Sequence, residues 1–455
     1  MAVPETVMAE MFDKAGRTLV VGLGETGLSV ARYLSSRGVP VAVVDSRAQP
    51  PGLERMRSGE LADVALFLGG FSDEAFERAE SIVLSPGISL DEPHIAAARA
   101  RGIPVIGDIE LFAQAAQAPV IAVTGSNGKS TVVTLLSAMA RCAGIDVRTG
   151  GNIGTPALDL IEDSEPALYV LELSSFQLET VHSLHLQAAV ILNISEDHMD
   201  RYDNLADYAA AKQMIYTGAD LQVVNADDPV VLALADPARP QLRFTQGVPA
   251  AGEYGLLQLD GVTWLARGSE RLLPATAIRL AGRHNLANAL AALALGEAAG
   301  LPLDAMLETL AEFQGLPHRM QFVAEHDGVR WYNDSKGTNV GATLAAIEGL
   351  EGPLVLIAGG DGKGADFTPL ANALRDKGRG CVLIGRDAPL LEAVLADVVA
   401  VRHAADMAGV VREAAAMAIP GDTVLLSPAC ASTDMFRNYI ERGELFMRAV
   451  REYVG

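Results

Sequence analysis

The run TGSNGKST, at residues 124–131, holds the residue types that a phosphate-binding loop needs. It follows the apolar run VIAV and precedes the helix-like stretch VVTLLSAMARCAG. Its two glycines would let backbone N–H groups approach phosphate oxygens, Lys129 would balance their charge, and Ser130 would offer a hydroxyl to magnesium. A helix N-terminus here would add about 0.3–1 kcal/mol per anion contact. Val123 replaces the first glycine of the usual GxxxxGK[ST] pattern, and the alternative is a plain strand–helix turn with an exposed lysine.

A second glycine motif, GLGETG at 22–27, lies between the runs TLVV and LSVARYLSSRG, and Asp45 ends the next apolar run. This arrangement is typical of a dinucleotide-binding fingerprint, in which an acidic residue about 20 positions further on holds a ribose hydroxyl. A nicotinamide-dependent oxidoreductase is one hypothesis, although it leaves the loop at 124–131 unexplained and no hydride-transfer site is evident. Nucleotide-sugar diphosphates bind the same kind of helix N-terminus, and the glycines could also serve strand–helix packing alone.

A carboxylate and an imidazole follow two further apolar runs. Glu172 ends the run LYVLE, and His198 comes a few residues after AVILNIS. The carboxyl ends of parallel strands face the same crevice, so both side chains would lie near the phosphate loop. They could bind magnesium there, although hard cations prefer oxygen ligands. A packing or capping role for His198 is the alternative.

The elements that position these residues are short apolar runs, each followed by a Gly-rich or polar turn and an Ala/Leu-rich stretch. This alternation predicts an α/β protein with parallel sheets covered by helices on both faces. The runs are continuously apolar, as strands buried on both faces should be. A different patch near 243–275 predicts a small antiparallel insert. The apolar runs lie at 18–24, 41–46, 120–126, 168–174, 189–195, 354–360, 381–385 and 423–429.

Length and pattern together predict three domains. A chain of 455 residues is too long for one ordinary core. Stretches bearing Pro and Gly near 102–108 and 314–319 mark the most plausible boundaries. The predicted domains are a Rossmann-like parallel sheet at 1–107, a P-loop ATPase-like, mainly parallel sheet with the antiparallel insert at 108–315, and a Rossmann-like sheet at 316–455.

Composition excludes several classes of protein. A net charge of −22 argues against a nucleic-acid partner, because phosphate backbones require clustered Lys and Arg. Cys142, Cys381 and Cys430 lie far apart in mostly apolar surroundings, which favours reduced core thiols over disulfides or a metal site. The N-terminus lacks a secretory pattern, and no apolar run reaches the roughly 18 residues of a membrane span. We therefore expect a soluble, cytoplasmic protein.

Taken together, nine segments of the chain resemble the Mur ligase family, and among its members those that add D-glutamate. The resemblance covers essentially the whole chain. The DNPR-type signature of the members that add diaminopimelate or lysine is absent, and folylpolyglutamate synthases lack a UDP-binding N-terminal domain such as 1–107. The segments are TGSNGKST, GNIG, LELSSFQLE, EDHMDRY, GRHNLANALAA, GLPHRMQ, NDSKGTN, GGDGKGADF and LSPACAS.

The resemblance implies ATP-dependent ligation of D-glutamate to UDP-N-acetylmuramoyl-L-alanine during peptidoglycan precursor synthesis. The substrate carboxylate would attack the γ-phosphate of ATP, giving an acyl phosphate and ADP. The amine of D-glutamate would then attack the acyl carbon, and phosphate would leave. Such chemistry needs mainly charge neutralisation and alignment. The resemblance also implies two magnesium ions and a monomeric protein.

The same resemblance assigns the site residues. Catalytic roles fall to Lys129, His198, Lys212 and Lys336. ATP contacts are Gly125, Ser126, Asn127, Gly128, Lys129, Ser130, Thr131, His284, Asn285, Asn288, Arg319 and Asp334. Metal ligands are Ser130, Glu172, His198 and carbamylated Lys212. Contacts to the UDP-substrate are Glu25, Thr26, Asp45, Ser46, Arg47, Gly87, Asn152 and Ser174. The D-glutamate pocket comprises Thr338, Lys363, Ser432, Thr433 and Tyr439.

Three of these C-terminal segments also have a basis in the pattern alone. NDSKGTN, GGDGKG and SPACAS follow the runs VRWYN, LVLIA and TVLL, and ligand sites of α/β proteins form at such turns. Lys363 would suit a carboxylate, although an exposed loop lysine is an equal alternative without the family. Tyr439 stands where the family often has Phe.

Lys212 depends most on the resemblance. It lies in the helix-like stretch LADYAAAKQMIY, where the pattern alone indicates a solvated lysine. A free ammonium about 4 Å from a divalent ion would meet roughly 8 kcal/mol of repulsion at an effective dielectric near 20. A carbamate would instead be an anion with two oxygens, which suits magnesium.

Overall fold

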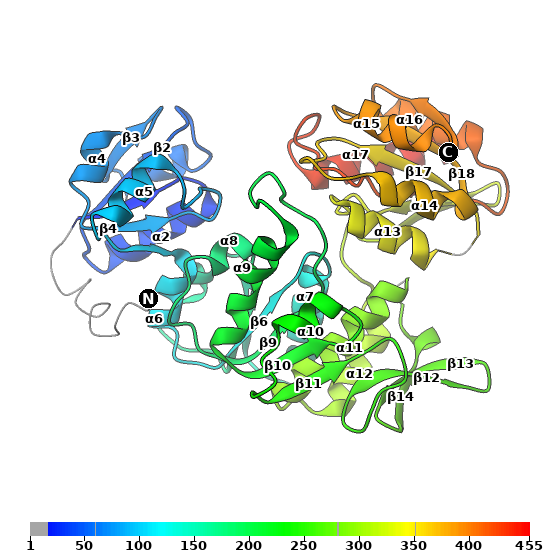
Figure 1. Ribbon diagram of the computed structural model, residues 1–455, viewed down its shortest axis with the longest axis horizontal. Helices are drawn as coiled ribbons and strands as arrows, with labels where there is room; N and C mark the ends of the chain where they lie inside the picture. Colours follow the sequence, from blue (N-terminus) through cyan, green and yellow to red (C-terminus); the bar gives the residue numbers. More distant parts are fainter. Residues whose placement is uncertain (1–16, 60, 280–281, 351) are drawn as a thin grey trace.

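A computed structural model describes residues 17–455 except 60, 280–281 and 351. The chain forms three α/β units in sequence, each built on its own sheet (Figure 1). This confirms the predicted fold class. Within the described part of the chain, no helix is both long and apolar enough to cross a membrane.

The N-terminal sheet has five parallel strands in the order β3-β2-β1-β4-β5. Its strands are β1 (Thr18–Val21), β2 (Val41–Asp45), β3 (Ala65–Leu68), β4 (Ser81–Leu84) and β5 (Val105–Gly107). Its helices are α2 (Glu25–Ser36), α3 (Leu53–Arg57), α4 (Asp73–Glu77) and α5 (Pro93–Ala100).

The central sheet has nine strands in the order β14-β13-β12-β11-β10-β9-β6-β8-β7. The strands are β6 (Val120–Thr124), β7 (Val147–Gly151), β8 (Leu168–Glu172), β9 (Leu186–Ile191), β10 (Ala219–Asn225), β11 (Gln241–Phe244), β12 (Tyr254–Leu259), β13 (Val262–Arg267) and β14 (Glu270–Pro274). The helices are α6 (Asp108–Ala115), α7 (Lys129–Cys142), η1 (Ala157–Leu160), α8 (Ser175–Leu178), α9 (Leu205–Thr217), α10 (Pro229–Leu234), η2 (Ala275–Ala277), α11 (Arg283–Ala298) and α12 (Leu303–Glu312). The pairs β12–β13 and β13–β14 are antiparallel, which confirms the insert and places it at one edge of the sheet.

The C-terminal sheet has six strands in the order β15-β16-β20-β17-β18-β19, and β15 is antiparallel to β16. The strands are β15 (Gln321–His326), β16 (Val329–Asn333), β17 (Leu354–Gly359), β18 (Gly378–Ile384), β19 (Ala400–His403) and β20 (Thr423–Leu426). The helices are α13 (Val340–Gly349), α14 (Thr368–Lys377), α15 (Ala388–Leu395), α16 (Met407–Met417) and α17 (Tyr439–Val454).

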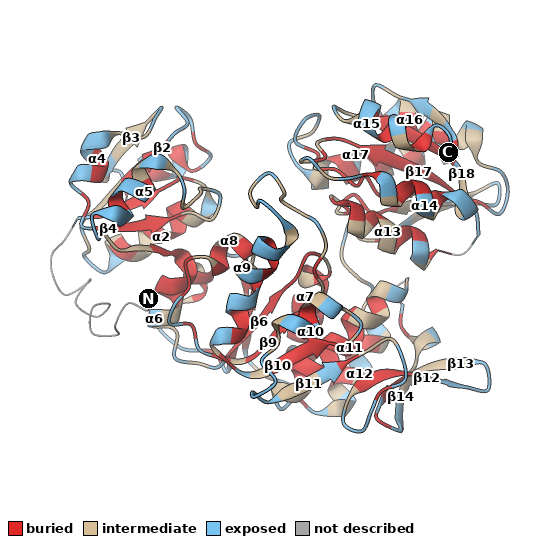
Figure 2. Ribbon diagram, viewed as in Figure 1, coloured by how far each residue is buried: buried red, intermediate tan, exposed pale blue. Residues whose placement is uncertain are grey.

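Burial explains the apolar runs. Every residue of β6, β8 and β17 is buried, because helices cover both faces of these central strands (Figure 2). Cys381 and Cys430 are buried free thiols, as predicted. The prediction of a core thiol is wrong for Cys142, which is exposed because it forms the last residue of α7 on the surface side.

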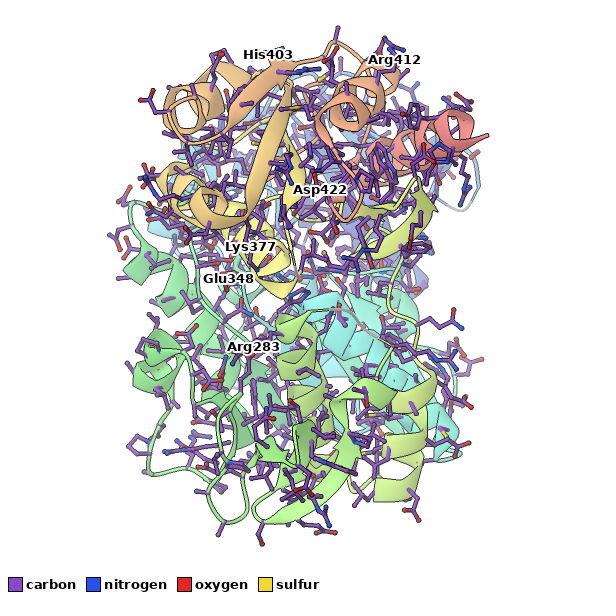
Figure 3. The ribbon with its side chains drawn as sticks, turned by 90° about the vertical axis from the view of Figure 1, so that its right-hand side faces the viewer. Arg283, Glu348, Lys377, His403, Arg412 and Asp422 are labelled. Atoms are coloured by element: carbon purple, nitrogen blue, oxygen red, sulfur yellow. The ribbon has the colours of Figure 1, made fainter. Side chains whose placement is uncertain are left out.

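Helix α13 links the C-terminal unit to the central one. Lys377 Nζ donates to the carbonyls of Ile347, Glu348 and Leu350, which satisfies the end of this helix. Figure 3 shows Glu348 and Lys377 on the side of the C-terminal unit that faces Arg283, the first residue of α11. The opposite end of α13 lies at the phosphate loop, because its N-cap residue Asn339 pairs with Asn127.

Candidate active site

The loop between β6 and α7 has the backbone that phosphate binding requires. Gly125 and Gly128 have φ angles of 145° and 88°, and a Cβ at Gly128 would lie 2.4 Å from Asn288 Oδ1. Asn193 holds the loop in place, because its side chain accepts from Asn127 N at 2.8 Å. Its carbonyl accepts from Ser126 N at 2.9 Å. Both glycines are thus required by the conformation of the loop.

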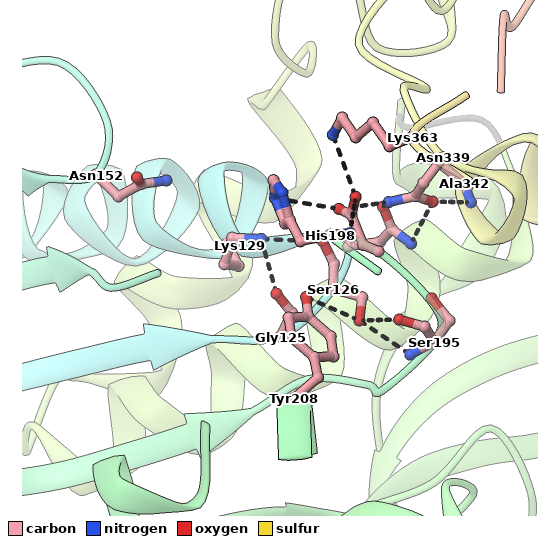
Figure 4. A network of polar contacts seen from close by, with 12 residues as sticks. Gly125, Ser126, Lys129, Asn152, Ser195, His198, Tyr208, Asn339, Ala342 and Lys363 are labelled. Atoms are coloured by element: carbon pink, nitrogen blue, oxygen red, sulfur yellow. Dashed lines mark hydrogen bonds and ion pairs between the residues drawn. The ribbon is translucent and has the colours of Figure 1, made fainter. Parts of the chain in front are cut away.

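Lys129 folds back on this loop. Its Nζ donates to the carbonyls of Gly125 at 2.7 Å and Ser126 at 2.9 Å (Figure 4). Loss of hydration holds the pKa of Lys129 below its ordinary value, although Glu172 and Asp197 act in the opposite direction. The ammonium is therefore poorly compensated until an anion reaches the loop.

A cavity of about 280 Å³ adjoins the loop. Residues from the central and C-terminal units share its wall, as does Lys336, which was predicted to be catalytic. Most of the predicted ATP contacts also lie there: Asn127, Gly128, Thr131, His284, Asn285, Asn288, Arg319 and Asp334. Asn225, Phe244 and Gln246 also line it, from the ends of β10 and β11. No motif in the sequence singled out these three residues.

The hydrogen bonds of Glu172 leave one of its two carboxylate oxygens available to a cation. Its Oε1 accepts from Asn152 Nδ2 at 2.8 Å, while its buried Oε2 has no partner among the described residues. The His198 ring packs on Phe176 with centroids 4.9 Å apart, and burial lowers the pKa of this imidazole, which favours the neutral form that binds metals. The described residues contain no group of three His, Cys, Asp or Glu side chains around a common point. A cation would therefore also need hydroxyl, carbamate or substrate oxygens.

Lys212 is buried, with only 1% of its surface exposed, so the pattern's indication of a solvated lysine is wrong. The helix carries it inward to a point where its Nζ lies 3.4 Å from Thr124 Oγ1 and 4.6 Å from the centroid of the Tyr208 ring. Burial, followed by the charge of Lys129, lowers the pKa of Lys212 well below its ordinary value. The neutral amine is favoured as a result.

Side chains of the C-terminal unit reach the phosphate loop directly. Arg319 Nη2 donates to Ser130 Oγ at 3.2 Å. The amides of Asn339 and Asn127 pair in both directions at 3.2 Å. Asn339 Nδ2 also donates to Asp197 Oδ2 at 3.1 Å (Figure 4). Asn339 and Asp197 were missed by the sequence reasoning, although both lie in or beside the quoted segments NDSKGTN and EDHMDRY.

Lys336 and Asp334 occupy a buried environment beside the cavity. Lys336 Nζ lies 4.0 Å from the centroid of the Tyr439 ring, and burial lowers the pKa of this lysine to about 8. Burial also raises the pKa of Asp334 to about 6, although its oxygens accept from Ser427 Oγ at 2.7 Å and Met320 N at 3.2 Å.

The residues predicted to bind D-glutamate lie on three loops and at the start of α17. Lys363 is half-buried with φ 53°, and it forms an ion pair with Asp197 at 3.3 Å, so it is not an exposed loop lysine. Ser432 is buried, Thr338 is half-buried and Thr433 is exposed. Their common role stays a prediction.

A second cavity, of about 520 Å³, opens between the N-terminal and central units. A Cβ at Gly27 would lie 1.9 Å from the Gly22 carbonyl oxygen, whereas one at Gly24 would meet no protein atom within 4 Å. Packing therefore explains Gly27 but not Gly24. Seven residues predicted to contact the UDP-substrate line this cavity: Glu25, Thr26, Asp45, Ser46, Arg47, Gly87 and Asn152.

Two residues of this region have a structural task as well. Burial would raise the pKa of Asp45, but hydrogen bonds from Arg47 and the backbone of Leu23 hold it below its ordinary value. Asp45 thereby fixes the glycine loop. Ser174 Oγ accepts from Gln177 N at 3.2 Å and so caps α8. Gln177, and not the predicted Ser174, lines the second cavity.

Comparison with known proteins adds independent findings. Three family models match the chain: Mur ligase MurD-like, N-terminal domain, at 16–107; Mur ligase middle domain at 123–296; and Mur ligase, glutamate ligase domain, at 318–430. A UDP-N-acetylmuramoylalanine–D-glutamate ligase of Nitrosococcus oceani is 59% identical over 440 residues, which cover 96% of this chain and 97% of that protein. One of Pseudomonas aeruginosa is 51% identical over 438 residues, covering 95% and 97%.

Solved structures of low sequence identity share the fold. A MurF ligase of Thermotoga maritima in complex with ADP aligns with a TM-score of 0.62 at 18% identity, covering 96% of each chain. A UDP-N-acetylmuramate–alanine ligase of the same organism aligns with a TM-score of 0.60 at 19% identity, covering 96% of this chain and 99% of that one. The full-length matches to relatives and the three successive family models show that the chain belongs to the Mur ligase family.

Proposed function

We propose that the protein joins D-glutamate to UDP-N-acetylmuramoyl-L-alanine with hydrolysis of ATP to ADP and phosphate, in peptidoglycan precursor synthesis. One observation carries the proposal. Asn152 lines the second cavity and donates to Glu172 at 2.8 Å, so the end of that cavity meets the phosphate-loop region. A UDP-linked substrate in the second cavity can therefore present its carboxylate to ATP in the first.

The side chains of this chain supply the charge and alignment that both steps need. Lys129 and Arg319 would neutralise the phosphates of ATP as the substrate carboxylate attacks the γ-phosphorus and ADP leaves. Lys336 would stabilise the acyl phosphate that results. The amine of D-glutamate, placed by Lys363, then attacks the acyl carbon, loses a proton, and expels inorganic phosphate.

Glu172, His198 and Ser130, with the carbamate of Lys212, fit two magnesium ions. The observation that supports a cation here is Glu172 Oε2, a buried oxygen for which the described residues provide no hydrogen-bond partner. When bound, magnesium would screen the negative charge of the phosphates and help to orient them for the attack. A neutral, buried Lys212 amine can add to carbon dioxide, forming an N–C bond and releasing one proton, which gives the carbamate anion.

We further propose that the protein is cytoplasmic and acts as a monomer. The decisive test measures ADP release with UDP-N-acetylmuramoyl-L-alanine as acceptor and each candidate amino acid in turn. We expect turnover with D-glutamate. If ADP is released with a different amino acid and not with D-glutamate, the assigned amino-acid substrate is wrong. If the protein binds ATP but releases no ADP with any amino acid, it is a non-catalytic nucleotide-binding module.

The glycine motif should bind a UDP-sugar and no nicotinamide cofactor. We expect Gly24→Ala to weaken UDP-N-acetylmuramoyl-L-alanine binding by about tenfold at unchanged stability, because the added methyl group enters the cavity without touching protein. Gly27→Ala is the matched control, since its methyl group meets a carbonyl and should lower the melting temperature. Equilibrium titration of the whole chain measures both. Tight binding of NAD without UDP-sugar binding would restore the oxidoreductase hypothesis.

The C-terminal unit should move during turnover. Arg319 and Lys363 both contact the central unit, yet substrates must enter and products must leave between them. Domain closure is the usual answer to this demand. We expect small-angle scattering profiles to change when ATP and UDP-N-acetylmuramoyl-L-alanine are added together, and identical profiles would contradict closure.

A further inference from the structure

Arg442, one turn into α17, is a buried cation whose hydrogen bonds go to a serine side chain and two backbone carbonyls. Its side chain is fully buried, at 0% exposed. Among the described residues, Asp434 and Asp334 act on its charge electrostatically, but neither forms an ion pair with it. Burial lowers the pKa of this group to about 10, so it remains a cation at neutral pH. Buried arginines are normally paired, and one without an ion pair requires other acceptors.

The acceptors of Arg442 are two loops of the candidate site. Nε donates to Ser335 Oγ at 3.0 Å and Nη2 to the Ser335 carbonyl at 2.8 Å. Nη1 donates to the Cys430 carbonyl at 3.1 Å. Ser335 directly precedes Lys336, and Cys430 lies two residues before Ser432. The Arg442 guanidinium thus fixes two peptide planes, one just before Lys336 and one just before Ala431. The loops that carry Lys336 and Ser432 begin at these planes.

Each of these peptide planes is anchored again at its opposite end. The N–H of Lys336, which shares a peptide with the Ser335 carbonyl, donates to the His318 carbonyl at 3.1 Å. The N–H of Ala431, which shares a peptide with the Cys430 carbonyl, donates to the Asp361 carbonyl at 2.8 Å. His318 neighbours Arg319, and Asp361 lies two residues before Lys363. The loops that carry Arg319, Lys336, Lys363 and Ser432 therefore meet through Arg442.

We propose that Arg442 is a positioning residue that sets the pocket for the amino-acid substrate by holding the loops that form it. This rests on the proposed function. A guanidinium serves here because its planar fork reaches three acceptors on two loops, and a lysine ammonium at the end of a flexible chain does not reproduce that geometry. Arg442 touches no reacting atom and acts only through the loops that it holds.

The test compares Arg442→Met and Arg442→Lys with Arg402→Met, a matched control on β19 whose guanidinium pairs with Glu413 at 2.8 Å. KM is measured for ATP, for UDP-N-acetylmuramoyl-L-alanine and for whichever amino acid the wild-type protein uses, together with the melting temperature. We expect Arg442→Met to raise KM for the amino acid at least about tenfold and to change KM for the UDP-substrate by less than twofold. Arg442→Lys should lie between Met and wild type, and Arg402→Met should match wild type.

Equal changes in all three KM values, in step with the melting temperature, would overturn the proposal and leave Arg442 a structural residue. If Arg442→Met does not fold, Ser335→Ala replaces it, because it removes one acceptor and spares both carbonyls. That variant should raise KM for the amino acid a few-fold, and unchanged KM would equally count against the proposal. Wild-type turnover with an amino acid other than D-glutamate would refute the assigned substrate alone.

Discussion

Replacing Lys129 by Ala should lower kcat by at least about 10²–10³-fold while the melting temperature shifts by no more than a few degrees. The loss follows from the position of the ammonium on the phosphate loop, where it would meet charge that develops on ATP. Stability should hold because the pKa of Lys129 falls on folding. A cation whose pKa is lowered destabilises the folded chain at every pH below its ordinary pKa, so its removal costs little stability at neutral pH.

Lys377→Met is the matched control, because Lys377 also donates to backbone carbonyls but lies at the far end of α13. It should lower the melting temperature and keep kcat. Single-turnover measurement of ADP formation and calorimetry separate the two effects. Near-normal ligation by the Lys129→Ala variant would show that the loop does not bind the reacting phosphates.

The fold could be predicted best for strands that are buried on both faces of a sheet. All eight continuously apolar runs are strands, since a strand covered on both faces needs apolar residues at every position. The eight runs missed strands inside the sheets, such as β4 and β10, and several strands at the edges, of which β7 is an example. It pairs only with β8, and its residues VRTGG include two glycines that read as a turn. Edge strands bury one side and tolerate polar residues, so their sequences carry little signal.

The candidate site was predictable where a motif forms one loop, as at 124–131. It was not predictable where a residue acts through partners distant in the sequence. Asn339 and Asn127 pair across 212 positions. Arg442 binds Ser335 across 107. Neither pairing follows from local pattern, because only the packing of separate sheets brings these loops together. Lys212 differs again, since its helix has no clear apolar face to indicate burial.

The second large effect concerns Lys212. We expect Lys212→Ala to lose activity by at least about 100-fold, and small carboxylic acids such as formate or acetate to restore part of it. The structure supplies the reason for the modification: the amine is buried, short of acceptors, and close enough to Lys129 for that charge to lower its pKa further. A carbamate removes the repulsion and adds two oxygens near Glu172, whose Oε2 has no hydrogen-bond partner in the described part of the chain.

Two controls separate this role from packing. Lys212→Met keeps most of the side-chain volume against Tyr208 but cannot be carbamylated, so its activity should be as low as that of the Ala variant while its stability stays near wild type. Only the Ala variant leaves room for an added carboxylic acid, so rescue should be confined to it. Wild-type protein in ¹³C-labelled bicarbonate should show one carbamate carbon signal that is absent from both variants. Near-normal turnover of Lys212→Met, or a substrate-bound structure with an unmodified Lys212, would refute the carbamate.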